Sequence, residues 1–279
     1  MLWLLYGNSG TLKPGWKPLA SLLFFRSKFV QEQTGGPLKI LADKLSARVP
    51  LGADDVAAFL ALPFSARTVE PHHCVVRERE RTTHCALLLS GFAIRSKIVA
   101  SGHRQILAIQ MRGELLDIQN ALLEKADHSV HMLTAGTIAV IPKEEIVALT
   151  LARPRIGHAI WVYTLVEGSI FREWTVNVGR RNARSRIAHL FCEFSLRLRL
   201  AGLGRHDEYE LPMTQEQLAD ATGLTPVHVN RTIKALEADG LITRPNPRSI
   251  LIADWRKLAD EGDFDSNYLH LTPQEALIV

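Results

Sequence analysis

The clearest periodic pattern in the chain lies in residues 214–236, where apolar positions recur at the spacing of two short helices. Leu218 and Ala221 give the first helix an apolar face, and the small Ala219 allows a second helix to cross closely over it. In the second helix the apolar side chains recur at Val229, Ile233 and Leu236. The pattern therefore predicts two amphipathic helices that pack against each other.

The ends of both helices carry capping residues. Thr214 is placed to cap the first helix, and Gln217 completes a capping-box pattern with it. Gly223 ends that helix, because glycine readily adopts the left-handed conformation that the turn needs. Thr225 caps the second helix, and Pro226 occupies its first turn, where a missing N–H costs nothing. This combination predicts a helix-turn-helix, whose second helix enters the DNA major groove.

The outward positions of the second helix support DNA binding over a simple buried helix pair. His228, Asn230, Arg231 and Lys234 can all contact bases or phosphates, and residues 221–236 contain no acidic side chain. Residues 241–254 then predict two strands around a turn, the wing of a winged helix, with Arg244 and Arg248 near its tip. The predicted DNA-contacting residues are Thr225, Pro226, His228, Asn230, Arg231, Lys234 and Arg248.

The first half of the chain has a different pattern. Residues 37–63 show helical spacing, and residues 66–143 contain several β-rich runs, two of them joined by a hairpin turn at Ser101-Gly102. Strands at such regular spacing favour a sandwich or jelly roll. Residues 113–125 predict a short helix between the strands.

Three helices are predicted between the strands and the helix-turn-helix. A short helix opens at Pro142, a longer one covers residues 156–174, and another covers residues 177–200. The apolar stripe from Leu165 to Phe171 is the expected seam of a homodimer.

Composition and charge add few constraints. A chain of 279 residues is long enough for two domains, and its hydrophobic fraction of 47% is typical of soluble globular proteins. The net charge is only +4, but seven arginines and one acid lie between residues 178 and 206. Their position favours a surface that partly faces phosphate, with a solvated helix face as the alternative.

The sequence carries no motif for a membrane span, a signal peptide, a disulfide or a cofactor. No apolar run approaches the roughly 18 residues of a membrane helix, and the start lacks the basic segment of a signal peptide. The three cysteines form no paired motif, so we expect a cytoplasmic protein without disulfides. A zinc or iron site is the alternative use of six residues: His72, His73, Cys74, His84, Cys85 and His103. Strand alternation sends neighbouring side chains to opposite faces, so we expect no metal and no other cofactor.

Together, this order of elements resembles the Crp/Fnr family of bacterial transcription regulators across residues 38–254. The matching stretches are Gly113-Glu114, Arg186-Ile187-Ala188, the helix-turn-helix and the wing. The resemblance implies an α+β chain with a cyclic-nucleotide-binding-like jelly roll, a long dimerisation helix and a winged helix-turn-helix. It further implies that a homodimer binds palindromic double-stranded DNA and works with RNA polymerase. The expected divisions are an extension (1–37), sensor domain (38–160), dimerisation helix (161–180), DNA-binding domain (181–254) and tail (255–279).

The resemblance also implies an effector pocket. Family members that bind cyclic nucleotide use a Gly-Glu pair for the ribose, which matches Gly113-Glu114, and an Arg-Ser pair for the phosphate. The Arg-Ser position falls on His128-Ser129, and a neutral histidine is a poor phosphate clamp. Where the family offers hydroxyls to the base, the long helix has Phe171 and Arg172. We therefore expect no control by cyclic nucleotides and leave the effector open.

Two other departures from the family concern an iron–sulfur cluster and the operator sequence. Residues 1–73 contain no cysteine, so an iron–sulfur cluster is not expected. Val227 stands where many members carry a base-reading glutamate, so the operator should differ from theirs. Two alternatives remain at this point, a cyclic-nucleotide-binding signalling module and a metal-dependent cupin-like enzyme; the leading expectation is a regulator without enzymatic activity.

Overall fold

The computed structural model describes residues 36–203, 208–246 and 248–277. The predicted N-terminal extension therefore falls almost entirely outside the described residues. The described chain begins with two helices, α1 (Lys39–Arg48) and α2 (Ala53–Leu60), which confirm the predicted helical lead-in. The apolar face of α1 is buried, with Leu41 and Leu45 in a core cluster together with Tyr163.

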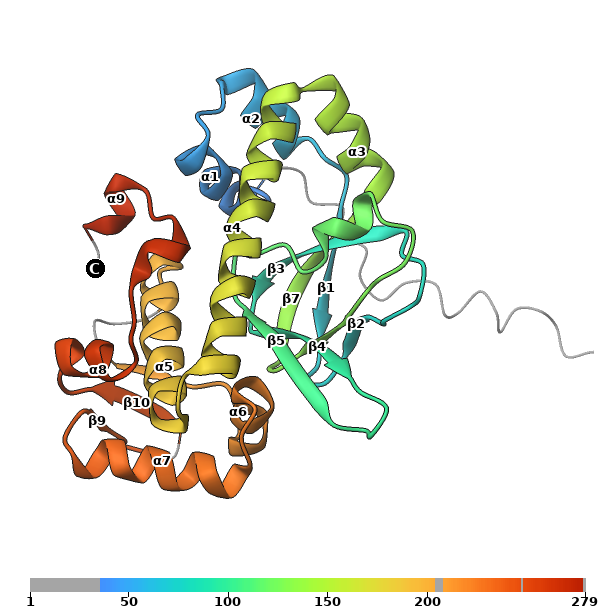
Figure 1. The fold of residues 1–279 in the computed structure, drawn as a ribbon. Helices are drawn as coiled ribbons and strands as arrows, with labels where there is room; N and C mark the ends of the chain where they lie inside the picture. Colours follow the sequence, from blue (N-terminus) through green and yellow to red (C-terminus); the bar gives the residue numbers. More distant parts are fainter. Residues whose placement is uncertain (1–35, 204–207, 247, 278–279) are drawn as a thin grey trace, which may run out of the picture. The chain divides into compact units, whose positions relative to one another are not determined.

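The β domain contains two antiparallel sheets, as the regular strand spacing predicted (Figure 1). The first sheet has the order β1-β7-β3: β1 (Ser65–Val69), β7 (Gly136–Pro142) and β3 (His84–Ser90). The second has the order β2-β6-β4-β5: β2 (Cys74–Val76), β6 (Ser129–Met132), β4 (Ala93–Ile98) and β5 (Arg104–Gln110). Leu88 and Ile138 of the first sheet share an apolar cluster with Val130 and Met132 of the second. The predicted hairpin joins β4 to β5, with Gly102 at φ +84°.

The predicted helix over residues 113–125 is wrong. It shrinks to the four-residue 3-10 helix η2 (Ile118–Ala121). The residues before η2 lie against β3 instead, because the Leu116 N–H donates to the Ala86 carbonyl at 2.8 Å. Leu115 also forms an isolated antiparallel bridge with Leu87. Backbone groups paired in this way cannot join a helical ladder.

Three helices follow β7: α3 (Lys143–Ala152), α4 (Pro154–Arg180) and α5 (Ala183–Leu200). The predicted start of the third helix at residue 177 is wrong, because α4 continues to Arg180. The break comes at Asn182, whose side-chain oxygen accepts hydrogen bonds from the N–H groups of Arg184 and Ser185 in the first turn of α5. At 27 residues, α4 is about 40 Å long.

The C-terminal part is a winged helix-turn-helix followed by a packed tail. It contains β8 (Glu208–Glu210), α6 (Gln215–Thr222), α7 (Pro226–Ala238), β9 (Ile242–Thr243) and β10 (Ser249–Ile252). The tail contains α8 (Trp255–Glu261), η3 (Ser266–Leu269) and α9 (Pro273–Ala276). Gly262 packs so closely on α5 that an added Cβ would lie 2.6 Å from the His189 nitrogen.

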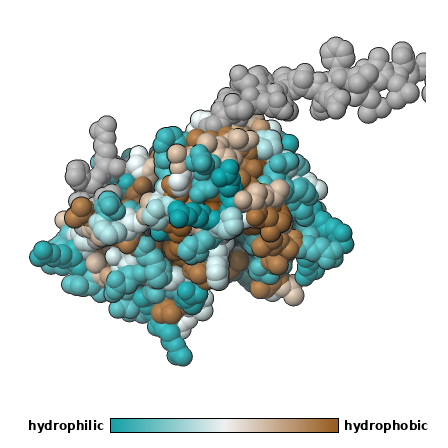
Figure 2. All heavy atoms as spheres, turned by 90° about the horizontal axis from the view of Figure 1, so that it is seen from above, coloured by the Kyte–Doolittle hydropathy of each residue, from teal (hydrophilic) through white to brown (hydrophobic). Residues whose placement is uncertain are grey.

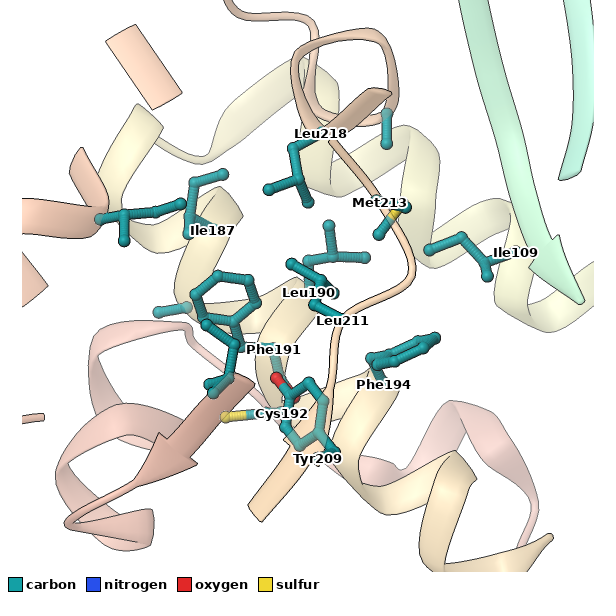
Figure 3. Packing of buried hydrophobic residues seen from close by; sticks show 14 of the residues in the cluster. Ile109, Ile187, Leu190, Phe191, Cys192, Phe194, Tyr209, Leu211, Met213 and Leu218 are labelled. Carbon is teal, nitrogen blue, oxygen red and sulfur yellow. The ribbon is translucent and has the colours of Figure 1, made fainter. Parts of the chain in front are cut away.

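One apolar cluster connects the two halves of the described chain. Figure 3 shows Phe191 and Phe194 of α5 among side chains from α6 and β8, with Ile109 of β5 beside them. Apolar side chains also reach the surface, and Figure 2 shows such patches between polar residues on the face seen from above. On α4, large apolar side chains are exposed at Trp161, Leu165 and Val176.

Candidate nucleic-acid interface and sensor site

The helix-turn-helix has the caps that its sequence predicted. The Thr214 hydroxyl accepts from the Gln217 N–H, and the Gln217 side chain accepts from the Thr214 N–H at 2.8 Å. Gly223 adopts the left-handed conformation at φ 65° and ψ 35°. Thr225 caps α7 by accepting from the His228 N–H at 3.3 Å. These local bonds fix the angle at which α7 leaves α6.

The two faces of α7 differ sharply. Val229, Ile233 and Leu236 are buried, as predicted, and anchor the helix in the large apolar cluster. On the opposite face, Arg231 and Lys234 are exposed, and neither forms an ion pair with a described residue. A shallow concave surface of about 500 Å³ on this side is lined by Gln215, Pro226, Val227, Asn230, Arg231 and Lys234.

The other five predicted DNA-contacting residues lie on or near this surface. Thr225 and Pro226 are exposed at the start of α7, and His228 is half-buried one turn further on. Asn230 is also half-buried, and its amide donates to the Gln215 side chain at 3.2 Å, which links α7 to α6. Arg248 is exposed near the wing turn, where the Asn246 side chain accepts from its N–H at 2.9 Å. Pro247, the other predicted turn residue, lies outside the described residues.

Most of the arginines before the helix-turn-helix have internal partners. Arg181 pairs with Glu173 and Asp263 at 2.6 and 3.1 Å, and Arg184 pairs with Asp239 and Glu261 at 2.7 and 2.9 Å. These two guanidinium groups therefore hold α5 to the tail and to neighbouring helices. Their positive charge is balanced by these carboxylates, which argues against a phosphate-facing role for the two.

Arg186, from the same group, caps the first helix of the motif. Its guanidinium donates to the carbonyl of Thr222, the last residue of α6, at 2.9 Å, and to the Arg181 carbonyl at 2.8 Å. Carbonyls at a helix C-terminus have no partner within the helix, and a cation there is favourable. Arg186 thus positions α6. Arg205 lies outside the described residues.

Of the predicted sensor residues, Glu114 is held by cations of the protein itself. The Arg197 guanidinium lies 3.0 Å from its carboxylate and also 2.9 Å from that of Glu193, and the Lys44 ammonium is 3.2 Å away. Burial alone would raise the pKa of Glu114, but Arg197 and Lys44 outweigh it and lower that pKa to about 2. Glu114 is therefore a charged partner of α1 and α5.

The other predicted sensor residues do not gather around Glu114. His128 is buried between Asp127 at 2.8 Å and Gln119 at 3.3 Å, and burial lowers its pKa, which keeps it neutral. The Ser129 hydroxyl accepts from the Glu78 N–H at 3.0 Å. Gly113, next to Glu114, adopts φ +82°, and its backbone lies close to Ile40 of α1. On α4, Phe171 packs under a guanidinium from β4, and Arg172 is exposed.

The guanidinium above Phe171 belongs to Arg95, a site residue that the sequence pattern did not reveal. Arg95 is only 3% exposed. It donates to the carbonyls of Leu115 and Leu116 at 2.9 and 3.0 Å and to the Glu167 carboxylate of α4 at 2.7 Å. An internal cation therefore occupies the region where β4, the segment before η2 and α4 meet. The one sequence signal was a charged residue within an otherwise apolar half of a strand.

Asp117 completes this internal polar network. Its carboxylate accepts from the Ala86 N–H at 2.7 Å, and burial raises its pKa to about 6. The Tyr163 hydroxyl accepts from the Leu115 N–H at 3.1 Å, and Gln110 donates to the Leu115 carbonyl at 3.0 Å. Residues 115–117 are thus bonded to β3, β5 and α4 by groups of the chain itself.

The cysteine and histidine residues weighed as metal ligands do not converge: no group of three potential ligands occurs among the described residues. Cys85 is buried, with its thiol 3.9 Å from the Asp117 carbonyl, and burial raises the pKa of that thiol well above its usual range, so the thiol stays protonated. Within the described chain, no helix is long and apolar enough to cross a membrane.

Known protein families match both halves of the chain. A family model described as a cyclic nucleotide-binding domain matches residues 66–152, and one described as a Crp-like helix-turn-helix domain matches residues 185–261. The nitrogen fixation regulation protein FixK of Bradyrhizobium diazoefficiens is 30% identical over 168 residues, which cover 60% of this chain and 70% of that protein. The chain belongs to the Crp/Fnr family of transcription regulators.

Two further relatives support the assignment of this chain to the Crp/Fnr family. The transcriptional activator protein FnrL of Cereibacter sphaeroides is 27% identical over 210 residues, covering 72% of this chain and 82% of that protein. The solved structure of FixK2 from Bradyrhizobium japonicum has the same fold, with a TM-score of 0.65 and 18% identity over 71% of this chain and 96% of that one. Family membership favours a regulator over the cupin-like enzyme and the stand-alone signalling module.

Proposed function

We propose that this Crp/Fnr regulator binds a palindromic operator as a homodimer, with α7 in the major groove and without a cyclic nucleotide. The observation that carries the proposal is the exposed face of α7, where Arg231 and Lys234 have no ion-pair partner among the described residues. Charged groups that the fold leaves unpaired on a capped recognition helix are available to base edges and phosphates.

Within this interface, Arg231 is the residue proposed to read a guanine, because a guanidinium can contact its O6 and N7 together. His228 lies one turn nearer the start of α7 and supplies a second polar group. Val227, which is 80% exposed, offers an apolar side chain that suits a thymine methyl group. Asn230 holds Gln215 in place beside them, since its amide is already hydrogen-bonded to that side chain.

The remaining interface residues are proposed to contact the backbone of DNA. Lys234 is exposed further along α7, and Arg248 is exposed on the wing. Thr225 and Pro226 bring the N-terminus of α7 to the same surface, where the helix dipole favours phosphate. Such contacts set register and orientation and carry no sequence information directly.

The dimer seam is proposed to lie on the exposed stripe of α4. Trp161 and Leu165 are 65% and 56% exposed, and Val176 lies on the same helix. Gly168 and Arg172 continue the alternating spacing of four and three residues that coiled coils use. Sedimentation should show a dimer, and Leu165→Glu should convert it to a monomer. A stable wild-type monomer that binds one palindrome tightly would contradict this seam.

Cyclic nucleotides are proposed to bind no better than millimolar. A phosphate buried in the jelly roll would need a cation, but His128 is held neutral and Arg95 already serves two carbonyls and Glu167. Glu114 is likewise committed to Arg197. Isothermal titration with cyclic AMP and cyclic GMP tests this. Micromolar binding coupled to a tenfold gain in operator affinity would show that the phosphate site lies elsewhere.

RNA polymerase is the proposed protein partner, as expected for a DNA-bound regulator of this family. Transcription of a template that carries the selected operator, with polymerase and the purified protein alone, tests the idea. A change in transcript yield that requires the operator supports it; operator-bound protein that leaves the yield unchanged contradicts it.

A further inference from the structure

A cavity of about 290 Å³ lies where five segments of the described chain meet. Its walls come from α1, the turn at residues 112–114, α4, α5 and the segment from η3 to α9. The volume is close to the lower end, roughly 300 Å³, of typical small-molecule sites. None of the residues proposed to contact DNA lines it. The cavity is therefore separate from the DNA interface.

The acidic side chains that line the cavity are already neutralised. Asp43 pairs with Lys39 at 2.6 Å, and Glu167 pairs with Arg95 at 2.7 Å. Glu114 has two cationic partners, and Glu275 lies 3.9 Å from the Arg48 guanidinium and accepts the Thr272 N–H at 2.7 Å in a helix cap. Two of the neutralising cations, Lys39 and Arg95, lie outside the cavity wall. The four acids of the wall therefore cancel the charge of its four cations, Lys44, Arg48, Arg112 and Arg197, only in part.

Three cations of the wall have donors to spare. Arg112 is exposed and forms no ion pair with a described residue. Arg48 donates from Nη2 to the Leu269 carbonyl at 3.3 Å and lies 3.9 Å from the Glu275 carboxylate, while its Nη1 has no hydrogen-bond partner among the described residues. Lys44 contacts one carboxylate, that of Glu114, and lies 5.8 Å from the centre of the Tyr163 ring. An ammonium group has three N–H donors, so Lys44 can bind a second acceptor.

We propose that this cavity binds a small anion with carboxylate or phosphate groups, held by Lys44, Arg48 and Arg112. The aromatic ring of Tyr163 and the aliphatic side chains of Val166 and Ile170 would cover its apolar part. Ammonium and guanidinium groups form short, strong hydrogen bonds to carboxylate and phosphate oxygens, because donor and acceptor carry opposite charges.

Ligand binding here would connect the sensor to the DNA-binding half. The wall contains Glu114, which follows β5, and Arg197 of α5, which precedes the helix-turn-helix. An anion that bridges the two sides stabilises the arrangement in which they meet, by the free energy of its binding. This inference goes beyond the proposed function, and it is tested without DNA, so its failure would leave the operator proposal untouched.

The test uses the full chain and two probes, inorganic phosphate and succinate, at constant ionic strength. Saturable binding by calorimetry is expected for at least one probe, with a rise in melting temperature, and the stronger probe identifies the anionic group. Succinamide, which has the shape of succinate without its charge, should give neither signal. Arg112→Gln and Lys44→Gln should each weaken binding by about tenfold or more.

Arg256→Gln is the matched control, because Arg256 is equally exposed but lies on α8 outside the cavity wall. It should change the dissociation constant by less than about twofold. The proposal is overturned if neither probe binds saturably at millimolar concentrations. It is also overturned if Arg112→Gln and Arg256→Gln weaken binding equally, because the anion would then be responding to overall charge.

Discussion

The interior around η2 and the outer face of α7 are both polar, but their polar groups are used in opposite ways. Arg95 donates three hydrogen bonds to other parts of the β domain and to α4. Arg231 and Lys234, on α7, point to solvent without an ion-pair partner among the described residues. Groups that satisfy one another stabilise a fold, whereas groups left free can bind a partner. Arginine thus stabilises the fold in one region and is proposed to recognise DNA in the other.

The largest effect should follow from breaking an internal ion pair. Arg197→Met leaves the buried carboxylate of Glu193 without its cation and removes one partner from Glu114. We expect a loss of about 3–5 kcal/mol in the free energy of unfolding, as for other buried pairs that lose one member. Urea denaturation measures it, with Arg256→Met as the exposed control. A loss no greater than that of the control would contradict the structural role of this pair.

A smaller and pH-dependent effect should follow at Asp117. Burial raises its folded pKa from 3.8 to about 6, so the folded protein loses stability as pH rises from 3.8 to about 6. Asp117→Asn retains the oxygen that accepts the Ala86 N–H but cannot ionise. We therefore expect the variant to gain stability relative to wild type at pH 8, by about 1–3 kcal/mol, and little at pH 4. Denaturation at both pH values tests this; a difference that does not change with pH would contradict it.

On the recognition face, Arg231→Ala should leave stability unchanged and weaken operator binding. The expected cost is about 1–3 kcal/mol, because one bidentate contact to guanine is lost. Fluorescence anisotropy with operator and mutated-operator DNA measures it. Arg67→Ala, an exposed arginine on β1, is the control. If Arg231→Ala discriminates between bases as strongly as the wild-type protein at every position of the half-site, Arg231 reads none of these bases.

Lys234→Ala should have the smallest effect of the four. A phosphate contact releases about one counterion, so the slope of log affinity against log salt should fall by about 1 for each half-site. All DNA sequences should be weakened alike, because the contact carries no base information. Titrations of operator and random DNA at several salt concentrations test this. A loss confined to the operator would instead place Lys234 among the base-reading residues.

The helix-turn-helix could be predicted from sequence because its determinants are local. The capping box joins Thr214 to Gln217, the turn depends on Gly223, and Thr225 caps the helix that follows directly. Each interaction spans three residues or fewer, so spacing alone reveals it. The apolar face of α7 follows in the same way from helical periodicity.

The sensor region could not be predicted as well, because its partners are far apart in the chain. Glu114 and Arg197 are 83 residues apart, and Arg95 and Glu167 are 72 apart. Nothing in the local sequence tells whether an arginine faces DNA or a distant carboxylate. For that reason the sequence does not separate Arg181 and Arg184, which pair internally, from the other arginines of residues 178–206. It also predicts a helix over residues 113–125, which pairing with β3 prevents.

The most direct test of the central claim is a selection of bound DNA sequences by the full-length protein, without added ligand, beside Arg231→Ala. We expect the wild-type protein to enrich a two-fold symmetric motif with half-sites about 10 base pairs apart. The variant should enrich the same motif with one position in each half-site relaxed. Enrichment of no motif by the wild-type protein, or a motif that appears only when a cyclic nucleotide is added, would contradict the account.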